Sequence, residues 1–194
     1  MKAGRPKAFD EVEVIERAMD VFWLKGYEAT GLTELLECMG ISRQSLYDTF
    51  GNKRGLFVRV IEHYRRTQLS AALALLDRDG SRIDNVKAVV HFFEELALDA
   101  RCRGCLVANT LVEFAPKDEE VVKLLRDTLA LLQDSLQRSL EEAQAGGELA
   151  ASKSPAKIAR ALVNATIGLA VTGKLQMDPV TVHDIYDGTL SMLD

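Results

Sequence analysis

The side chains best suited to specific chemistry form the polar stretch from Ser42 to Asp48. Within it, Arg43, Gln44 and Ser45 carry hydrogen-bond donors and acceptors at successive positions. Because apolar residues of the same stretch recur at helical spacing, the polar ones are expected on the opposite, exposed face. An Arg suits guanine O6 and N7, and a Gln suits adenine N7 and N6–H2, so this face is able to read base edges. An ordinary solvated helix surface has the same pattern.

A second segment whose side chains could react or bind a metal is the C-x-x-C run from Cys102 to Cys105. This spacing serves redox couples or half of a zinc site. A second Cys or His pair is lacking, because Cys38 and the three histidines are scattered, and a structural zinc site is therefore not expected. Cys105, at a helix start beside arginines, is either a reactive thiol or a packed core residue, and packing is the favoured interpretation.

Enzymatic chemistry finds little support in this sequence. It contains no G-x-S-x-G, H-E-x-x-H, Walker or G-x-G-x-x-G motif, and no cofactor is expected. His91 with Glu94 and Glu95 lacks a matching pair elsewhere and is interpreted as a solvated face. We therefore expect a protein that is not an enzyme.

Composition favours an all-α protein. Of 194 residues, 47% are hydrophobic, only 6% are aromatic and four are proline, which suits helices with a buried core. No apolar run approaches the roughly 20 residues that span a bilayer, and no secretory signal begins the chain. The expected compartment is the cytoplasm, without membrane association.

Charge is distributed unevenly along the chain. The net charge is −5, but residues 1–7 carry three basic residues and no acid, and residues 41–66 carry six basic residues against two acidic. Residues 67–194 hold 13 basic against 19 acidic residues and would repel a polyanion. A net basic charge is thus local to residues 1–7 and 41–66.

Apolar periodicity and Gly or Pro breakers predict about nine helices. Three short helices fill the first 50 residues: one after an N-cap at Asp10, one ending at Gly40 and one beginning at Ser42. A longer helix runs from Asn52 toward Leu76. Five more are predicted at roughly 82–101, 104–115, 118–145, 155–177 and 179–193. The expected domains are 1–55 and 56–194.

Residues 29–57 have the pattern of a helix-turn-helix. Gly40 is able to take the positive φ that the tight turn needs, Ile41 fills the space between the helices, and the Ser42 hydroxyl caps the second one. This stretch resembles the TetR family of bacterial transcriptional regulators. The resemblance rests on matching residues at matching spacing: Gly26-Tyr27, Thr30, Gly40-Ile41-Ser42, Leu46-Tyr47, Phe50, Lys53 and Leu56.

The resemblance implies roles for these residues on double-stranded operator DNA. Phosphate contacts fall to Thr30, Tyr47 and Lys53, with Ser42 at the start of the reading helix. Base reading falls to Arg43, Gln44 and Ser45. The tail around Arg5 either enters a minor groove or is a disordered end.

Asp48 departs from the His or Tyr common at this position of the family. Beside DNA, its carboxylate either accepts from a cytosine amino group or pairs with Arg43 or another base reader, and pairing is favoured.

For the rest of the chain, the resemblance implies an effector-binding and dimerisation domain. The last two helices are expected to form the homodimer that a palindromic operator requires, although they equally suit a monomer core. Gly104-Cys105-Leu106 with Asn109 also resembles a subgroup that includes electrophile- and oxidant-responsive repressors. The candidate effector or sensor residues are Phe92, Phe93, Cys102, Cys105, Asn109, Glu113 and Phe114.

The expected function is a regulator, most simply a repressor, that releases its operator when a small-molecule or thiol-reactive effector binds. The fourth helix would act as the lever between the two domains. Two alternatives stay open: an activator of the same fold, and a helical adaptor whose helix-turn-helix does not bind DNA.

Overall fold

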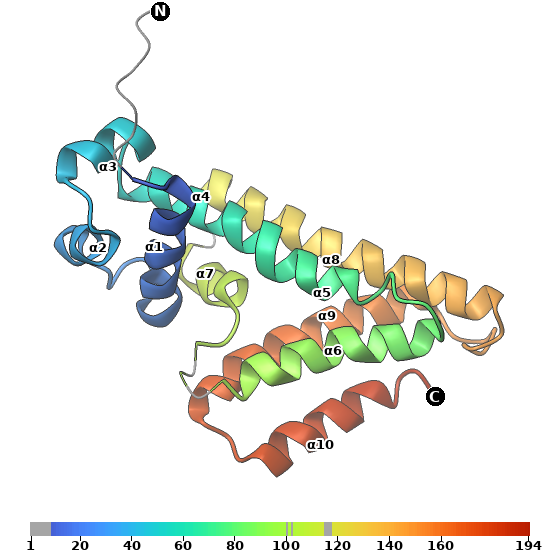
Figure 1. The fold of residues 1–194 in the computed structure, drawn as a ribbon. Helices are drawn as coiled ribbons and strands as arrows, with labels where there is room; N and C mark the ends of the chain where they lie inside the picture. Colours follow the sequence, from blue (N-terminus) through green and yellow to red (C-terminus); the bar gives the residue numbers. More distant parts are fainter. Residues whose placement is uncertain (1–8, 100, 102, 115–117) are drawn as a thin grey trace, which may run out of the picture. The chain divides into compact units, whose positions relative to one another are not determined.

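The computed structural model describes residues 9–99, 101, 103–114 and 118–194, and all its regular elements are helices (Figure 1). The all-α prediction is confirmed. The chain divides into two units, Met1–Tyr64 and Arg65–Asp194. This boundary follows Tyr64, whereas the division predicted from the sequence follows residue 55.

Four helices make up the N-terminal unit: α1 (Glu11–Lys25), α2 (Leu32–Met39), α3 (Arg43–Phe50) and α4 (Lys53–Tyr64). The Asp10 side chain accepts from the N–H groups of Val12 and Glu13, so the predicted cap of α1 is confirmed. Helix α1 packs against α2 and α4. Their shared core includes Phe22 and Phe57, whose rings meet edge to face with centroids 4.8 Å apart.

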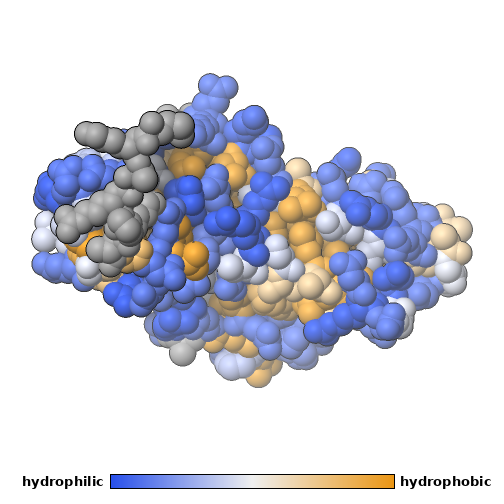
Figure 2. Space-filling model, turned by 45° about the horizontal axis from the view of Figure 1, so that its top comes forward, coloured by the Kyte–Doolittle hydropathy of each residue, from blue (hydrophilic) through white to orange (hydrophobic). Residues whose placement is uncertain are grey.

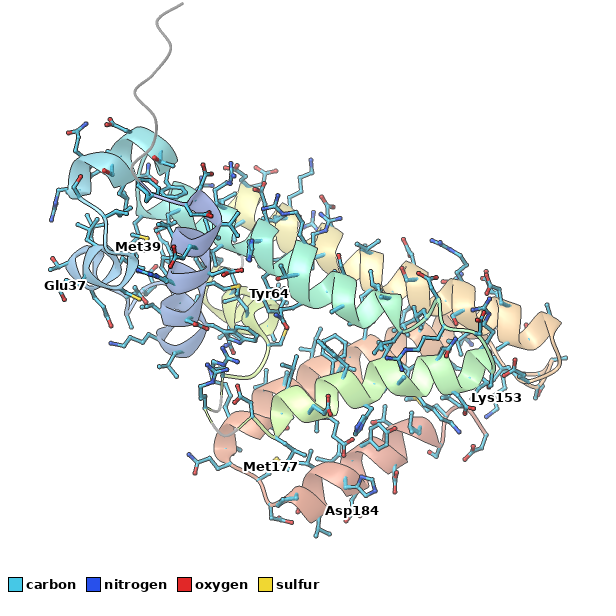
Figure 3. The ribbon with its side chains drawn as sticks, in the orientation of Figure 1. Glu37, Met39, Tyr64, Lys153, Met177 and Asp184 are labelled. Carbon is cyan, nitrogen blue, oxygen red and sulfur yellow. The ribbon has the colours of Figure 1, made fainter. Side chains whose placement is uncertain are left out.

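The turn between α2 and α3 has the predicted geometry. Gly40 adopts φ +67° and ends α2, and its N–H donates to the carbonyls of Leu36 and Glu37. A left-handed residue of this kind is the usual end of a helix before a sharp turn, and glycine takes it without strain. On α2, Met39 points into the unit and is 2% exposed, whereas Glu37 points outward (Figure 3).

The predicted fourth helix is interrupted. After α4 the chain makes a π-helical turn, Arg65–Leu69, and then continues as α5 (Ser70–Ala74). The apolar pattern explains the interruption, because the step between the buried residues Tyr64 and Leu69 is five residues long. A π turn matches that spacing, whereas α-helical spacing would place the two residues on different faces.

The C-terminal unit is built on α6 (Arg82–Ala97), α8 (Glu119–Ala145) and α9 (Pro155–Thr172), which pack against one another. Helix α7 (Leu106–Phe114) packs against α8 and α9, and α10 (Pro179–Leu190) packs against α6 and α9. Two helices end earlier in the chain than the predicted positions 101 and 177. Helix α6 ends at Ala97, and α9 is followed by a 3-10 turn at Gly173–Leu175.

One helix, Pro155–Leu175, is long and apolar enough to cross a membrane by composition. That signal is weak, because core helices share it. Here α9 contacts four neighbouring elements of its own unit, namely α6, α7, α8 and α10, which accounts for its apolar residues. On the face shown in Figure 2, hydrophobic side chains reach the surface as patches among hydrophilic ones.

Two glycines allow helix ends to approach closely. A Cβ on Gly104, which has φ +60°, would lie 2.4 Å from the carbonyl oxygen of Ala170 in α9. A Cβ on Gly173 would lie 2.7 Å from the carbonyl oxygen of Ala97 at the end of α6. No other residue fits these positions without moving the backbone.

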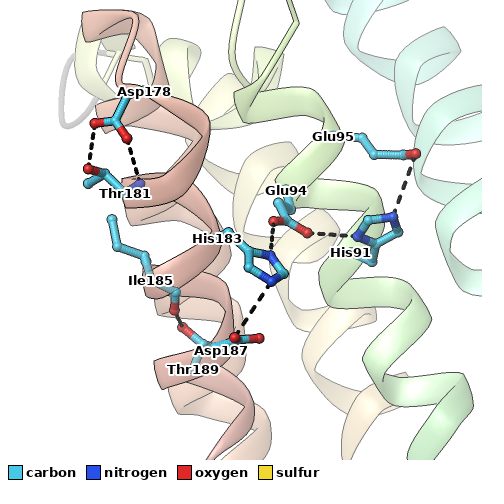
Figure 4. Close-up of polar contacts among 9 residues, drawn as sticks. All are labelled: His91, Glu94, Glu95, Asp178, Thr181, His183, Ile185, Asp187 and Thr189. Atoms are coloured by element: carbon cyan, nitrogen blue, oxygen red, sulfur yellow. Dashed lines mark hydrogen bonds and ion pairs between the residues drawn. The ribbon is translucent and has the colours of Figure 1, made fainter.

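A cluster of polar side chains links α10 to α6 through hydrogen bonds (Figure 4). The carboxylate of Glu94 is 3% exposed, and it faces His91 Nδ1 at 2.7 Å and His183 Nδ1 at 3.1 Å. The Tyr186 ring stacks on His183, with centroids 5.7 Å apart. Each oxygen of this buried carboxyl group thus has an imidazole partner, as a buried polar group requires.

Candidate nucleic-acid interface

Helix α3 begins at Ser42 through a pair of hydroxyl groups. Ser42 Oγ accepts from the Ser45 N–H at 3.0 Å, and the two side-chain oxygens lie 2.9 Å apart. Such a cap satisfies an N–H that the first helical turn leaves open. The predicted capping role of Ser42 is confirmed, and its hydroxyl is committed to starting the helix.

The two faces of α3 differ as the sequence predicts. Leu46 and Phe50 are buried, whereas Arg43, Gln44 and Tyr47 are exposed. Ser45 is half-buried beside the cap. Burial of the apolar pair fixes the rotation of the helix, and the donors and acceptors therefore face outward.

Asp48 belongs to this exposed face and pairs with a candidate base reader. Gln44 Nε2 donates to Asp48 Oδ1 at 2.7 Å, one helical turn away. Pairing with a base reader was the favoured prediction, and the partner is Gln44.

Lys53 opens helix α4, directly after the turn that follows α3. Asn52 Oδ1 accepts from the Gly55 N–H at 2.8 Å and so caps α4. Lys53 Nζ lies 4.2 Å from the centroid of the Tyr27 ring, a cation–π distance, and this ring in turn packs on Phe57. The positioning role of Tyr27 was missed by sequence reasoning, although the Gly26-Tyr27 pair of the motif was its signal.

Thr30 does not share this exposed surface. It is 1% exposed, and its hydroxyl donates to the Gly26 carbonyl at 2.6 Å. The hydroxyl thus serves the end of α1, and the phosphate contact through this side chain stays a prediction. Arg5, the expected minor-groove residue, lies outside the described residues.

The candidate effector residues are mostly core or framework residues of the C-terminal unit. Phe93 and Phe114 are buried, and half-buried Phe92 packs edge to face on Phe93. Glu113 is half-buried. Cys105 is 8% exposed, which suits packing better than reaction, and Cys102 lies outside the described residues.

Asn109 has a defined framework role. Its amide donates to the Arg103 carbonyl at 2.8 Å and accepts from Lys174 Nζ at 3.2 Å. The Arg103 side chain bonds Asp99 at 2.8 Å. Although burial raises the pKa of Asp99, the hydrogen bond and charge of Arg103 hold it below its ordinary value.

A cleft of about 280 Å³ opens in the C-terminal unit. None of the candidate effector residues that the structure describes lines it. Its walls come from α5, the turn after it, the start of α6 and one face of α8: Leu73, Leu76, Asp77, Arg82, Ser135, Arg138, Ser139 and Glu142. Ser139 Oγ is buried there without a hydrogen-bond partner among the described residues.

The described part of the chain contains no group of three or more His, Cys, Asp or Glu residues placed to hold a metal ion.

Two family models match the chain. Residues 14–60 match the bacterial regulatory proteins of the tetR family, and residues 83–188 match the tetracyclin repressor-like C-terminal domain. The uncharacterized HTH-type transcriptional regulator YezE of Bacillus subtilis is 33% identical over 98% of this chain and 100% of its own length. The HTH-type transcriptional repressor ComR of Escherichia coli is 31% identical over 75% of this chain and 70% of its own.

Solved structures agree with these matches. A cysteine variant of the TetR family regulator CifR, complexed with 26-base-pair operator DNA, has a TM-score of 0.86 at 29% identity and covers 96% of this chain and 98% of its own. Reduced NemR of E. coli has the same fold, with a TM-score of 0.81 at 18% identity over 91% of this chain and 93% of its own. The two matched domains, the confirmed helix-turn-helix and the full-length relative lead to one conclusion: the chain belongs to the TetR family of helix-turn-helix transcriptional regulators.

Proposed function

We propose that this protein is a cytoplasmic repressor that binds a palindromic operator as a homodimer and releases it when an effector binds the C-terminal unit. The observation that carries the proposal is the exposed polar face of α3, where Arg43 and Gln44 stand opposite buried Leu46 and Phe50. Donors and acceptors on a short, capped helix match the base edges of a major groove.

Phosphate contacts fall to Tyr47 and Lys53. The Tyr47 side chain is 44% exposed, and Lys53 is oriented by the Tyr27 ring at the start of α4. Hydroxyl and ammonium groups held this way set the position of a protein on a duplex without reading its sequence. CifR, a relative of the same fold, is complexed with operator DNA, and ComR is named a repressor, which favours repression over activation.

Dimerisation through α9, its 3-10 extension and α10 is supported by exposed apolar side chains. Val171, Leu175, Val180 and Ile185 are between 37% and 78% exposed along this segment. A palindrome presents half-sites about 34–36 Å apart or a multiple of that, and two copies of one reading helix match it only in a symmetric dimer.

Sedimentation velocity tests this interface. The pair Leu175→Glu with Val180→Glu is expected to give a monomer that loses operator affinity. Val112→Glu is the matched control, because Val112 is an equally exposed apolar residue, 78% exposed, that lies on α7 and outside the segment of the proposed interface. A dimer that survives the paired substitution would place the interface elsewhere.

The effector is proposed to be a small molecule, and the cleft beside Ser139 is a candidate site for it. A thiol-reactive effector acting on Cys105 is the second candidate. For that thiol, maleimide should release DNA from the native protein but not from Cys105→Ser. Equal release from the serine variant would exclude Cys105.

The decisive experiment is selection of duplexes from a random pool, followed by anisotropy titrations across salt concentrations with Arg43→Ala as the variant. We expect a palindromic duplex whose affinity falls steeply with salt and weakens on substitution. Transcription in vitro from that duplex then separates repression from activation. No enrichment, even after refolding without ligand, would favour the adaptor alternative.

A further inference from the structure

The side chain of Gln44 is held in one orientation by Asp48. An ionised carboxylate only accepts hydrogen bonds, so the Gln44 group that meets Asp48 Oδ1 at 2.7 Å must be the NH2. The orientation of the amide therefore follows from the chemistry of its partner. With one N–H donating to Asp48, the amide cannot rotate by half a turn without losing this bond.

This orientation leaves a defined pair of groups for a DNA base. The second N–H and the carbonyl oxygen of Gln44 have no partner among the described residues. Adenine offers an acceptor at N7 beside a donor at N6, which matches that pair. Guanine offers acceptors at both N7 and O6, so its O6 would face the Gln44 carbonyl oxygen. A freely rotating glutamine would avoid that conflict by presenting both N–H groups.

The same carboxylate acts against binding in general. Asp48 is exposed on the face that would meet a polyanion, and its charge repels phosphates whatever the sequence. The hydrogen bond to Gln44 offers a compensating gain, because a fixed amide discriminates between bases.

We propose that Asp48 is a specificity-determining positioning residue: it fixes the Gln44 amide for adenine against guanine and lowers affinity for all DNA. This inference rests on the proposed function, operator binding through α3. It makes Asp48 and Gln44 one reading unit, in which only Gln44 touches the base.

Two substitutions at residue 48 separate position from charge. Asp48→Asn removes the charge, but its carbonyl oxygen still accepts from Gln44. Asp48→Ala removes both. Glu37→Gln is the matched control, because Glu37 is an exposed carboxylate on α2 of the same unit. Helical content and unfolding midpoints of all variants show whether the fold is kept.

The experiment measures dissociation constants for the selected operator, for its single-base-pair variants and for random duplex at several salt concentrations. The base pair read by Gln44 is the one at which Gln44→Ala loses preference. There, Asp48→Ala should lower the preference for adenine over guanine by about tenfold and bind random duplex more tightly. Asp48→Asn should also bind random duplex more tightly, yet it should keep the preference for adenine over guanine. Glu37→Gln should leave this preference unchanged.

Each contrary outcome has one meaning. Unchanged preference in Asp48→Ala would overturn the positioning role. Equal loss in Asp48→Ala and Asp48→Asn would show that charge, not the hydrogen bond, sets the preference, and would overturn it as well. If the native protein enriches no duplex, the proposed function itself fails, a result distinguishable from both because it needs no variant.

Discussion

His183 Nδ1 on α10 lies 3.1 Å from Oε1 of the buried Glu94 on α6, and its other ring nitrogen lies 3.6 Å from Asp187. The hydrogen bond to Glu94, followed by the charge of Asp187, raises the pKa of His183 above its ordinary value of 6.5. The protonated ring therefore binds α10 to α6 more strongly than the neutral ring does.

Stability should follow this shift in a defined direction. A raised pKa means that the added stability is complete below pH 6.5 and disappears as the pH rises through the raised value. Urea titrations at pH 6 and pH 8, at one fixed protein concentration, should show a larger loss of unfolding free energy in His183→Gln at pH 6. An equal loss at both pH values would mean that His183 titrates identically in the folded and unfolded chain.

Lys53→Ala should weaken binding to every duplex by a similar factor. An ammonium group that meets phosphate contributes without regard to sequence, and its loss should lower the salt slope of log affinity by about one. Anisotropy titrations of the operator and of random duplex measure both effects. Lys157→Ala, an exposed lysine of α9, serves as the control. A Lys53 variant that lost preference among operator variants would instead assign base reading to this residue.

Gly104→Ala should destabilise the fold by about 2 kcal/mol or more, because the new methyl group meets the Ala170 carbonyl and the residue must keep a positive φ. Gly188→Ala, inside α10 and free of neighbours within 4 Å, should instead stabilise it by about 0.5–1 kcal/mol. Chemical denaturation of both variants measures whether each substitution lowers or raises the free energy of unfolding. A neutral Gly104→Ala would show that α7 and α9 separate at little cost.

Ser139→Ala should raise the unfolding free energy by about 1 kcal/mol, since it removes a buried hydroxyl without a partner. Ser135→Ala, a half-buried neighbour in the same cleft, provides the comparison. A clear loss of stability in Ser139→Ala would reveal a partner for this hydroxyl in solution.

Local signals made the N-terminal unit predictable. The Asp10 and Ser42 caps, the left-handed Gly40 and the apolar periodicity each act within a few residues, and all are found. The burial of Thr30 could not be predicted locally, because it depends on how the chain packs after α1. A hydroxyl that suits a phosphate suits a backbone carbonyl equally well.

Predictions for the C-terminal unit were correct about helices and less informative about sites. Apolar side chains such as Phe92 and Phe93 look alike in a core and in a pocket. The cleft at Ser139 brings together residues about 60 positions apart, which no local pattern reveals. The π turn was visible in principle, as the five-residue step from Tyr64 to Leu69.

The glycines at 104 and 173 fix a point in the C-terminal unit. There the ends of α6 and α9 and the segment before α7 approach so closely that a Cβ on either glycine would lie less than 3 Å from a backbone carbonyl oxygen. Helices held this closely cannot slide past one another at that point, but they remain able to turn about it. We expect the close approach to act as a pivot, so that an effector that moves these helices would do so by rotation, with displacements that grow with distance from the glycines.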